Sequence, residues 1–156
     1  MRRLLLVLLL LAAAPVSAAP ASAEDSSGAV RALYERFAAA QNAHDLAAVR
    51  PLLLPGPEFL WVSDGQSFWG ADAVLARMAS FQTAPVWRVE PDLARAVAVP
   101  VRDGVAYLHL PLVLVIGNSE RPDRLRFLVS MLGVETAQGW KIAALFTTTE
   151  KPVAGG

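Results

Sequence analysis

Residues 41–81 read QNAHDLAAVRPLLLPGPEFLWVSDGQSFWGADAVLARMASF and contain the segments that decide the fold. Asp45 can accept hydrogen bonds from the free amides of a following helix, so it is a predicted N-cap. The prolines and glycine that come next end this short helix. Bulky residues over 59–63 predict a strand, an Asp-Gly pair predicts a turn, and a further helix is expected to open at Gly70.

The helices on either side of this stretch are predicted from apolar spacing. Between Gly28 and Gln41, bulky residues recur at i, i+3, i+4 and i+7, which places them on one helix face. They are Val30, Leu33, Tyr34 and Phe37. The helix that opens at Gly70 carries a similar stripe, made of Val74, Leu75, Met78 and Phe81.

After Thr83 the apolar residues alternate with a period of two, which is typical of strands. The expected strands are Val86–Glu90, Arg95–Val101, Val105–Gly117, Leu125–Glu135 and Trp140–Thr149. Pro100 and Pro111 cannot donate to a strand ladder, so each predicts a bulge, a bend or an edge. The predicted fold class is α+β, with a bent antiparallel sheet wrapped on three N-terminal helices.

Four short motifs in this order are shared with a known family. They are Asn42-Ala43-His44-Asp45-Leu46, the strand and turn from Phe59 to Gly65, Gly70-Ala71-Asp72-Ala73-Val74, and Gly139-Trp140-Lys141-Ile142. In these motifs the chain resembles the nuclear transport factor 2-like superfamily, also called SnoaL-like. The resemblance implies a cone-shaped fold with a pocket. The superfamily includes isomerases, cyclases, dehydratases and members without known activity.

The first 23 residues predict a secretory signal peptide. Arg2 and Arg3 precede an unbroken apolar run over 4–14, and small residues of the A-x-A type follow. The run is shorter than the ~20 apolar residues that span a bilayer. We expect cleavage after Ala23, or alternatively after Ala18, and export to the periplasm or beyond the cell, with no stable membrane span afterwards. The mature chain 24–156 is then one domain with an ordered core over residues 28–150.

The composition excludes several kinds of site. The chain has no cysteine, so it has no disulfide, thiol nucleophile or thiolate metal site. The chain has 14 basic and 14 acidic residues, and signal cleavage removes Arg2 and Arg3. The mature chain then has a net charge of about −2, which argues against a nucleic-acid partner. Motifs of serine hydrolases, zinc proteases and P-loop enzymes are missing. The two histidines lie far apart, so neither a metal nor another cofactor is expected.

Aromatic residues are the predicted walls of the pocket. They suit an apolar ligand, and we expect Tyr34, Trp61 and Trp69 to line the site, with Trp69 near its mouth. Superfamily members often carry a histidine four residues after the isoleucine of the Gly-Trp-Lys-Ile strand, facing the cone. This chain has Phe146 there, which the resemblance makes an inward-facing ligand-binding residue in a more apolar pocket. Strand alternation would then place four side chains of this strand on the inward face: Trp140, Ile142, Ala144 and Phe146.

Four side chains are candidates for acid–base chemistry. His109 is a candidate because histidine is the side-chain type suited to acid–base work at neutral pH, although a half-buried, hydrogen-bonded histidine is the simpler interpretation. Asp64 could be a general base, although aspartate is also common in such turns for backbone reasons. Tyr34 or Tyr107 could donate to an oxyanion, as tyrosines of related isomerases do, with core packing as the alternative. His44, between two helices, is expected to be structural or solvent-facing.

Three functions are therefore considered. The sequence favours a non-catalytic binder of a small apolar molecule. The first alternative is an isomerase- or cyclase-like enzyme that transfers a proton on a steroid- or polyketide-like substrate. The second alternative is a module for self-association or protein interaction.

The segment Val105–Gly117 predicts a homodimer. Both of its alternating sets are apolar, whereas a sheet with one solvated face alternates apolar with polar residues. Helices can cover only the concave side of a bent sheet. The other side would expose more apolar surface than monomers usually do, so pairing through the outer face is expected. Either set could face outward.

Overall fold

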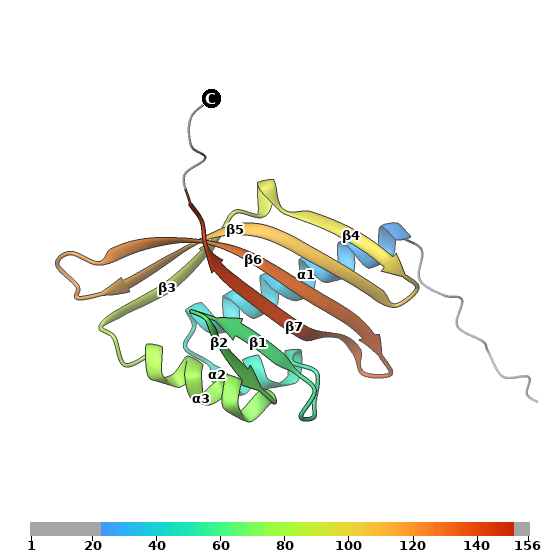
Figure 1. Cartoon of the computed structure of the whole chain (residues 1–156), viewed down its shortest axis with the longest axis horizontal. Coiled ribbons are helices and arrows are strands. Elements are labelled where there is room, and N and C mark those ends of the chain that lie inside the picture. The colour runs from blue at the N-terminus through green and yellow to red at the C-terminus, as the bar shows by residue number, and fades with distance from the viewer. Residues whose placement is uncertain (1–22, 152–156) are drawn as a thin grey trace, which may run out of the picture.

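The helices and strands follow the order expected from the sequence. The computed structural model describes residues 23–151. Its helices are α1 (Ala23–Asn42), α2 (Leu46–Val49) and α3 (Ala71–Phe81), with 3-10 turns η1 (Arg50–Leu52) and η2 (Leu93–Arg95). Its strands are β1 (Leu60–Ser63), β2 (Gln66–Trp69), β3 (Val86–Pro91), β4 (Val97–Arg102), β5 (Val105–Gly117), β6 (Asp123–Thr136) and β7 (Gly139–Thr149). The sheet bends around α1 (Figure 1), which confirms the predicted α+β cone.

Helix α1 begins earlier than the apolar pattern predicted. It starts at Ala23 rather than Gly28, so residues 24–27, which we placed outside the ordered core, are helical. Ser26 in this first turn is buried. The prediction relied on the spacing of bulky apolar residues, and residues 23–27 include none. Residues 1–22 of the predicted signal peptide lie outside the described residues. Within residues 23–151, no helix is both long and apolar enough to cross a membrane.

The break after α1 is built as predicted. His44 has a positive φ of 56°, which places its backbone in the left-handed region. A residue in this conformation commonly ends an α-helix. The Asp45 carboxylate accepts a hydrogen bond from the backbone nitrogen of Ala48 at 2.9 Å, so the predicted N-cap is confirmed. The His44 Nε2 lies 3.0 Å from the carbonyl oxygen of Trp87, and the two rings meet edge to face. His44 therefore has the structural role expected for it.

The sheet is mixed rather than wholly antiparallel. Its order is β2-β1-β7-β6-β5-β3, and β4 pairs with β5 as well. Strand β1 runs parallel to β7, which corrects the antiparallel sheet predicted from the sequence. The correction has a simple cause: hairpin signals report only neighbouring strands, and β1 and β7 are far apart in the chain. Strand β2 was also missed; it pairs with β1 across a turn in which Asp64 and Gly65 both have positive φ.

Pro100 and Pro111, the two strand prolines singled out from the sequence, mark irregular points, as expected. The pairing of β4 with β5 shifts register between Pro100 and Arg102. Pro111 lies where β5 changes partner, because β4 pairs up to His109 and β3 begins at Leu112. The Pro111 carbonyl accepts from the Asp92 nitrogen at 2.9 Å. The missing N–H therefore interrupts no ladder at this point.

A β-bulge in β7 decides which side chains face α1. Leu132 of β6 pairs with Ala144, whereas Gly133 pairs with Ile142. Ala143 is therefore an extra residue, and the alternation changes phase there. Ile142 and Leu145 are both buried, while Phe146 is 40% exposed. Our prediction that Phe146 and Ala144 share the inward face with Ile142 is wrong, because it assumed uninterrupted alternation.

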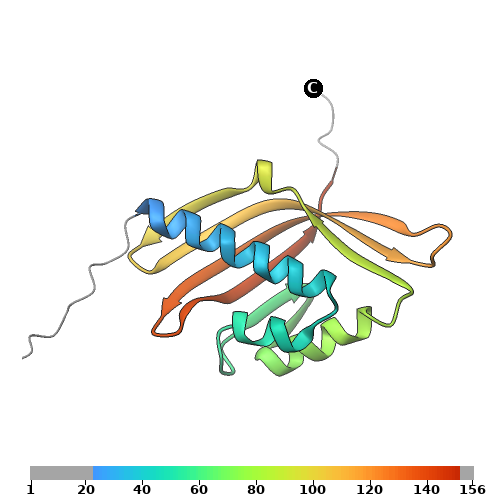
Figure 2. The same ribbon diagram turned by 180° about the vertical axis from the view of Figure 1, so that it is seen from behind.

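Helix α1 lies across one face of the sheet, as Figure 2 shows. A Cβ on Gly133 would come within 2.7 Å of the Val30 side chain, so a glycine at this position permits the close approach of α1. The opposite face of β5, β6 and β7, turned toward the viewer in Figure 1, is covered by none of the described helices. We call the face that packs on α1 the inner face and the other the outer face.

Candidate functional site

A cavity of about 600 Å³ lies between the second half of α1, the end of α3, strand β3 and the inner face of the sheet. The first half of α1 leaves no such space, because Val30 and Leu33 pack against fully buried strand residues. Most of the lining is aromatic or aliphatic. The apolar lining residues are Tyr34, Phe37, Trp61, Met78, Phe81, Trp87, Val89, Leu112, Leu114, Ile116, Leu125, Phe127, Val129 and Leu145.

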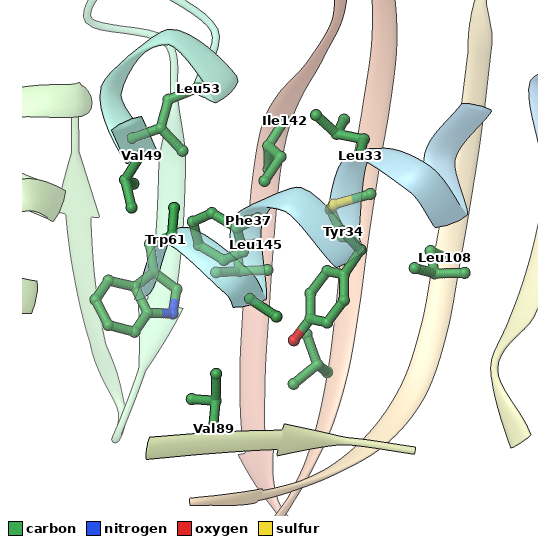
Figure 3. Close-up of a cluster of buried hydrophobic side chains, with 14 of the residues drawn as sticks. Leu33, Tyr34, Phe37, Val49, Leu53, Trp61, Val89, Leu108, Ile142 and Leu145 are labelled. Carbon is green, nitrogen blue, oxygen red and sulfur yellow. The ribbon is translucent and has the colours of Figure 1, made fainter. Parts of the chain in front are cut away.

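Helix α1 contributes Tyr34, Phe37 and Gln41 to the cavity. Their i, i+3, i+7 spacing puts them on one helix face. The Tyr34 side chain is buried, and its hydroxyl points toward the Val89 end of the cluster in Figure 3. Burial raises the pKa of this hydroxyl above its usual range. Tyr34 therefore stays protonated and can act as a hydrogen-bond donor, but not as a base.

Trp61 of β1 forms the facing wall. Its indole nitrogen donates to the Thr147 hydroxyl at 3.0 Å, which fixes the ring against β7. Phe68 and Phe81 pack on Trp61 with ring centroids at 5.7 Å and 6.5 Å. The predicted placement of Tyr34 and Trp61 at the pocket agrees with this geometry.

The rim of the cavity is charged. An Arg124 Nη donates to Glu90 at 2.6 Å, and the Arg126 Nε donates to Glu150 at 2.8 Å. Hydrogen bonds from Arg124 and then Arg88 lower the pKa of Glu90. The arginines near the β5–β6 hairpin, expected to form only a solvated face, thus reach the rim through Arg124 and Arg126.

Two predicted ligand-binding residues lie elsewhere. Phe146 is on the outer face and does not line the cavity. The presence of phenylalanine at position 146 therefore does not affect the polarity of the cavity. Other residues make the cavity apolar. Trp69 is 59% exposed and borders a separate depression beside Pro55 and Lys141. Trp69 was placed at the mouth because it follows a turn, but strand β2 carries it away from the cavity.

The candidate acid–base groups are divided between the two faces. His109 is on the outer face, where its Nδ1 lies 2.9 Å from the Ser130 hydroxyl on the neighbouring strand. Tyr107 is also outward and 41% exposed. Asp64 and Tyr34 both line the cavity. Asp64 sits at the tip of the β1–β2 turn, exposed to solvent.

Several polar lining residues were not singled out from the sequence. Gln41 is buried and its amide donates to the Phe37 carbonyl at 3.4 Å. The Arg77 Nε and the Trp87 indole nitrogen are buried without a hydrogen-bond partner. Arg77 could have been found, because it precedes Phe81 by four residues and so shares its helix face. Within residues 23–151, no group of three or more acidic, histidine or cysteine side chains could hold a metal ion.

The fold and the cavity together define a class: an α+β cone in which helices and a curved sheet enclose a space of ligand size. The family model described as the SnoaL-like domain matches residues 30–145. The chain belongs to the SnoaL-like domain family, and the resemblance stated from its motifs is confirmed. A comparison with curated proteins gives no match.

Solved structures share this fold at low sequence identity. An uncharacterised protein with a cystatin-like fold from Caulobacter vibrioides is 20% identical with a TM-score of 0.70, over 81% of this chain and 91% of that one. A nuclear transport factor 2-like superfamily protein from Salmonella enterica is 11% identical with a TM-score of 0.72, over 85% and 98%. A ketosteroid isomerase-like protein from Erwinia carotovora is 16% identical with a TM-score of 0.66, over 82% and 98%. At such identities the likeness extends to the fold alone.

Proposed function

We propose that this SnoaL-like domain is a non-catalytic binder of a small apolar molecule, held in the cavity between α1 and the sheet. The observation that carries the proposal is the lining: a space of about 600 Å³ walled by aromatic and aliphatic side chains. Cavities of ~300–1,000 Å³ with such walls and a few polar groups are typical of small-molecule sites. The outward position of His109 supports binding without turnover, since it takes a leading acid–base candidate out of the cavity.

The test is a titration of the mature protein with N-phenyl-1-naphthylamine, an uncharged dye that fluoresces in apolar surroundings. We expect saturable binding of about one dye per chain in the micromolar range, and displacement by 1-octanol. A fluorescence rise that never saturates, or that octanol does not reverse, would contradict the proposal.

Export of this binder is part of the proposal. Support comes from the two arginines, the apolar run and the A-x-A sites at the start of the chain. N-terminal sequencing of protein recovered from outside the cytoplasm should give Glu24 as the first residue, or Ala19 for the alternative site. Recovery only in the cytoplasm with Met1 intact would refute export.

One observation supports catalysis as the second candidate function of this cavity. The Tyr34 hydroxyl, a permanent donor, and the Asp64 carboxylate line the same cavity. A donor and a carboxylate are the two groups that a proton transfer next to a carbonyl requires. Isomerisation of a β,γ-unsaturated ketosteroid, followed by ultraviolet absorbance, would reveal such turnover. An enzyme of this kind requires activity in the wild-type protein and its loss in Asp64→Asn; no activity, or equal rates in both, would remove this candidate.

We further propose that two copies of the chain pair through the outer face. One row of residues in register crosses the outer face from β4 to β2. It consists of Val99, Tyr107, Leu132, Ala144, Leu60 and Trp69. All six are apolar or aromatic, and a two-fold dimer is the simplest arrangement that covers such a row. Light scattering should give a dimer mass at micromolar concentration; a monomer mass unchanged by concentration would refute pairing.

A further inference from the structure

The cavity contains an arginine without a carboxylate partner. Three arginines line it, and two of them form ion pairs: Arg124 with Glu90, and Arg126 with Glu150. Arg77 forms no ion pair with any described residue, and its Nε is enclosed without a hydrogen-bond acceptor. An enclosed donor with no acceptor is unfavourable in the empty protein. A ligand that brings an acceptor would remove that penalty.

Aromatic contacts hold the Arg77 guanidinium at the wall of the cavity. Its central carbon lies 4.3 Å from the ring centroid of Phe81 and 5.4 Å from that of Phe68. Stacking occupies the faces of the guanidinium plane, whereas its N–H donors point outward along the edges. The geometry therefore fixes the orientation of the group and leaves its donors uncommitted. A planar carboxylate or a sulfonate is the acceptor that fits such an edge best.

The charges around the cavity favour an anion. The charged lining residues are Arg77, Arg124, Arg126, Asp64 and Glu150. Glu90 and Glu150 pair with Arg124 and Arg126, so Arg77 and Asp64 are the two lining charges without an ion pair among the described residues. Asp64 opposes an anion, but it is exposed at a turn where water screens it. The field inside the cavity is therefore positive on the Arg77 side.

From these contacts we infer that the ligand is an amphipathic acid: its apolar body fills the aromatic cavity, and its carboxylate or sulfonate binds the edge of Arg77. This inference rests on the proposed binding function and specifies the ligand class for the same cavity. It assigns Arg77 as the residue that selects an acid over a neutral molecule of equal size.

The first test uses the wild-type protein with octanoate and 1-octanol as competitors for N-phenyl-1-naphthylamine. Without a cationic partner, octanol should bind better, because burying an ionised carboxylate is costly. We expect octanoate to displace the dye at concentrations at least about tenfold lower than octanol. Equal displacement, or a preference for octanol, would overturn the inference while leaving the apolar binder intact. No binding of the dye at all would refute the proposed function itself.

The second test separates Arg77 from other cations with a pair of related dyes. Anilinonaphthalene sulfonate carries an anionic group that N-phenyl-1-naphthylamine lacks. Arg77→Gln should weaken binding of the sulfonate dye about tenfold or more and change that of the neutral dye less than about threefold. Arg36→Gln, an exposed arginine of α1 outside the cavity, should change neither. An equal loss for both dyes, or no loss for the sulfonate, would overturn the role of Arg77.

Discussion

The two faces of strand β5 have nearly the same apolar composition but different surroundings. On the inner face, Leu108 and Leu110 are fully buried, and Leu112 and Leu114 continue the row into the cavity. On the outer face, Tyr107 is 41% exposed and no described helix covers it. The comparison shows that the sequence identifies a strand with two apolar faces, but the position of α1 determines which face becomes core and which is left uncovered by the described helices.

The largest expected difference between the faces is in stability. Leu108→Ala opens a hole in the core beside α1 and should lower the free energy of unfolding by about 2–5 kcal/mol. Leu128→Ala makes the same change on the outer face, where the side chain is half-buried, and should cost about 1 kcal/mol or less. Urea denaturation at one protein concentration measures both. Similar losses would mean that the outer face is as well packed as the inner one.

The next effect concerns pairing through the outer face. Tyr107→Glu puts a charge in the middle of the apolar row and should weaken the dimer about 30-fold or more, a change of ~2 kcal/mol. The fold of each copy should be unaffected because the side chain is partly solvated. Sedimentation over a dilution series measures the dissociation constant, and Arg36→Glu on α1 is the control. Unaltered dimerisation would show that another surface mediates pairing.

The smallest effect compares two adjacent threonines of β7. Thr147→Val removes the acceptor of the Trp61 indole nitrogen and should cost about 1–2 kcal/mol, since a buried donor is left unpaired. Thr148→Val, exposed on the outer face, should change stability by less than about 0.5 kcal/mol. Thermal unfolding followed by Trp fluorescence distinguishes them. Equal effects would contradict the inward position of Thr147 beside Trp61, and a larger effect of Thr148→Val would contradict the bulge at Ala143.

Local signals in the sequence were sufficient for most of the fold. Helix spacing located α1 and α3, the Asp-Gly turn located the end of β1, and strand β5 was predicted with its observed bounds. The parallel pairing of β1 with β7 could not be found in this way, because no local pattern reports contact between distant strands. Strand β2 is only four residues long and mostly exposed, so it has no apolar alternation to reveal it.

The site was predicted less completely than the fold. Tyr34 and Trp61, expected from their aromatic character, both line the cavity, and their contact with a ligand stays a prediction. Phe146 was placed inward by the resemblance to superfamily members, but it lies on the outer face. The alternation from Phe146 to Ile142 failed because Ala143 is an inserted residue, and an alanine gives no sign of a bulge. Arg77 was overlooked because a single charge on a helix is ordinarily solvated. Only the fold brings Arg77 against Phe68 and Phe81 and leaves it without an ion pair among residues 23–151.

The most direct test of the account is a comparison of two leucine-to-tryptophan variants in the dye titration. Leu114→Trp fills part of the cavity from the inner face, whereas Leu128→Trp adds the same bulk on the outer face. We predict that Leu114→Trp weakens binding of N-phenyl-1-naphthylamine about tenfold or more, while Leu128→Trp binds as the wild type does. Retained affinity in a folded Leu114→Trp protein, or loss only in Leu128→Trp, would contradict the claim that the inner face encloses the binding site.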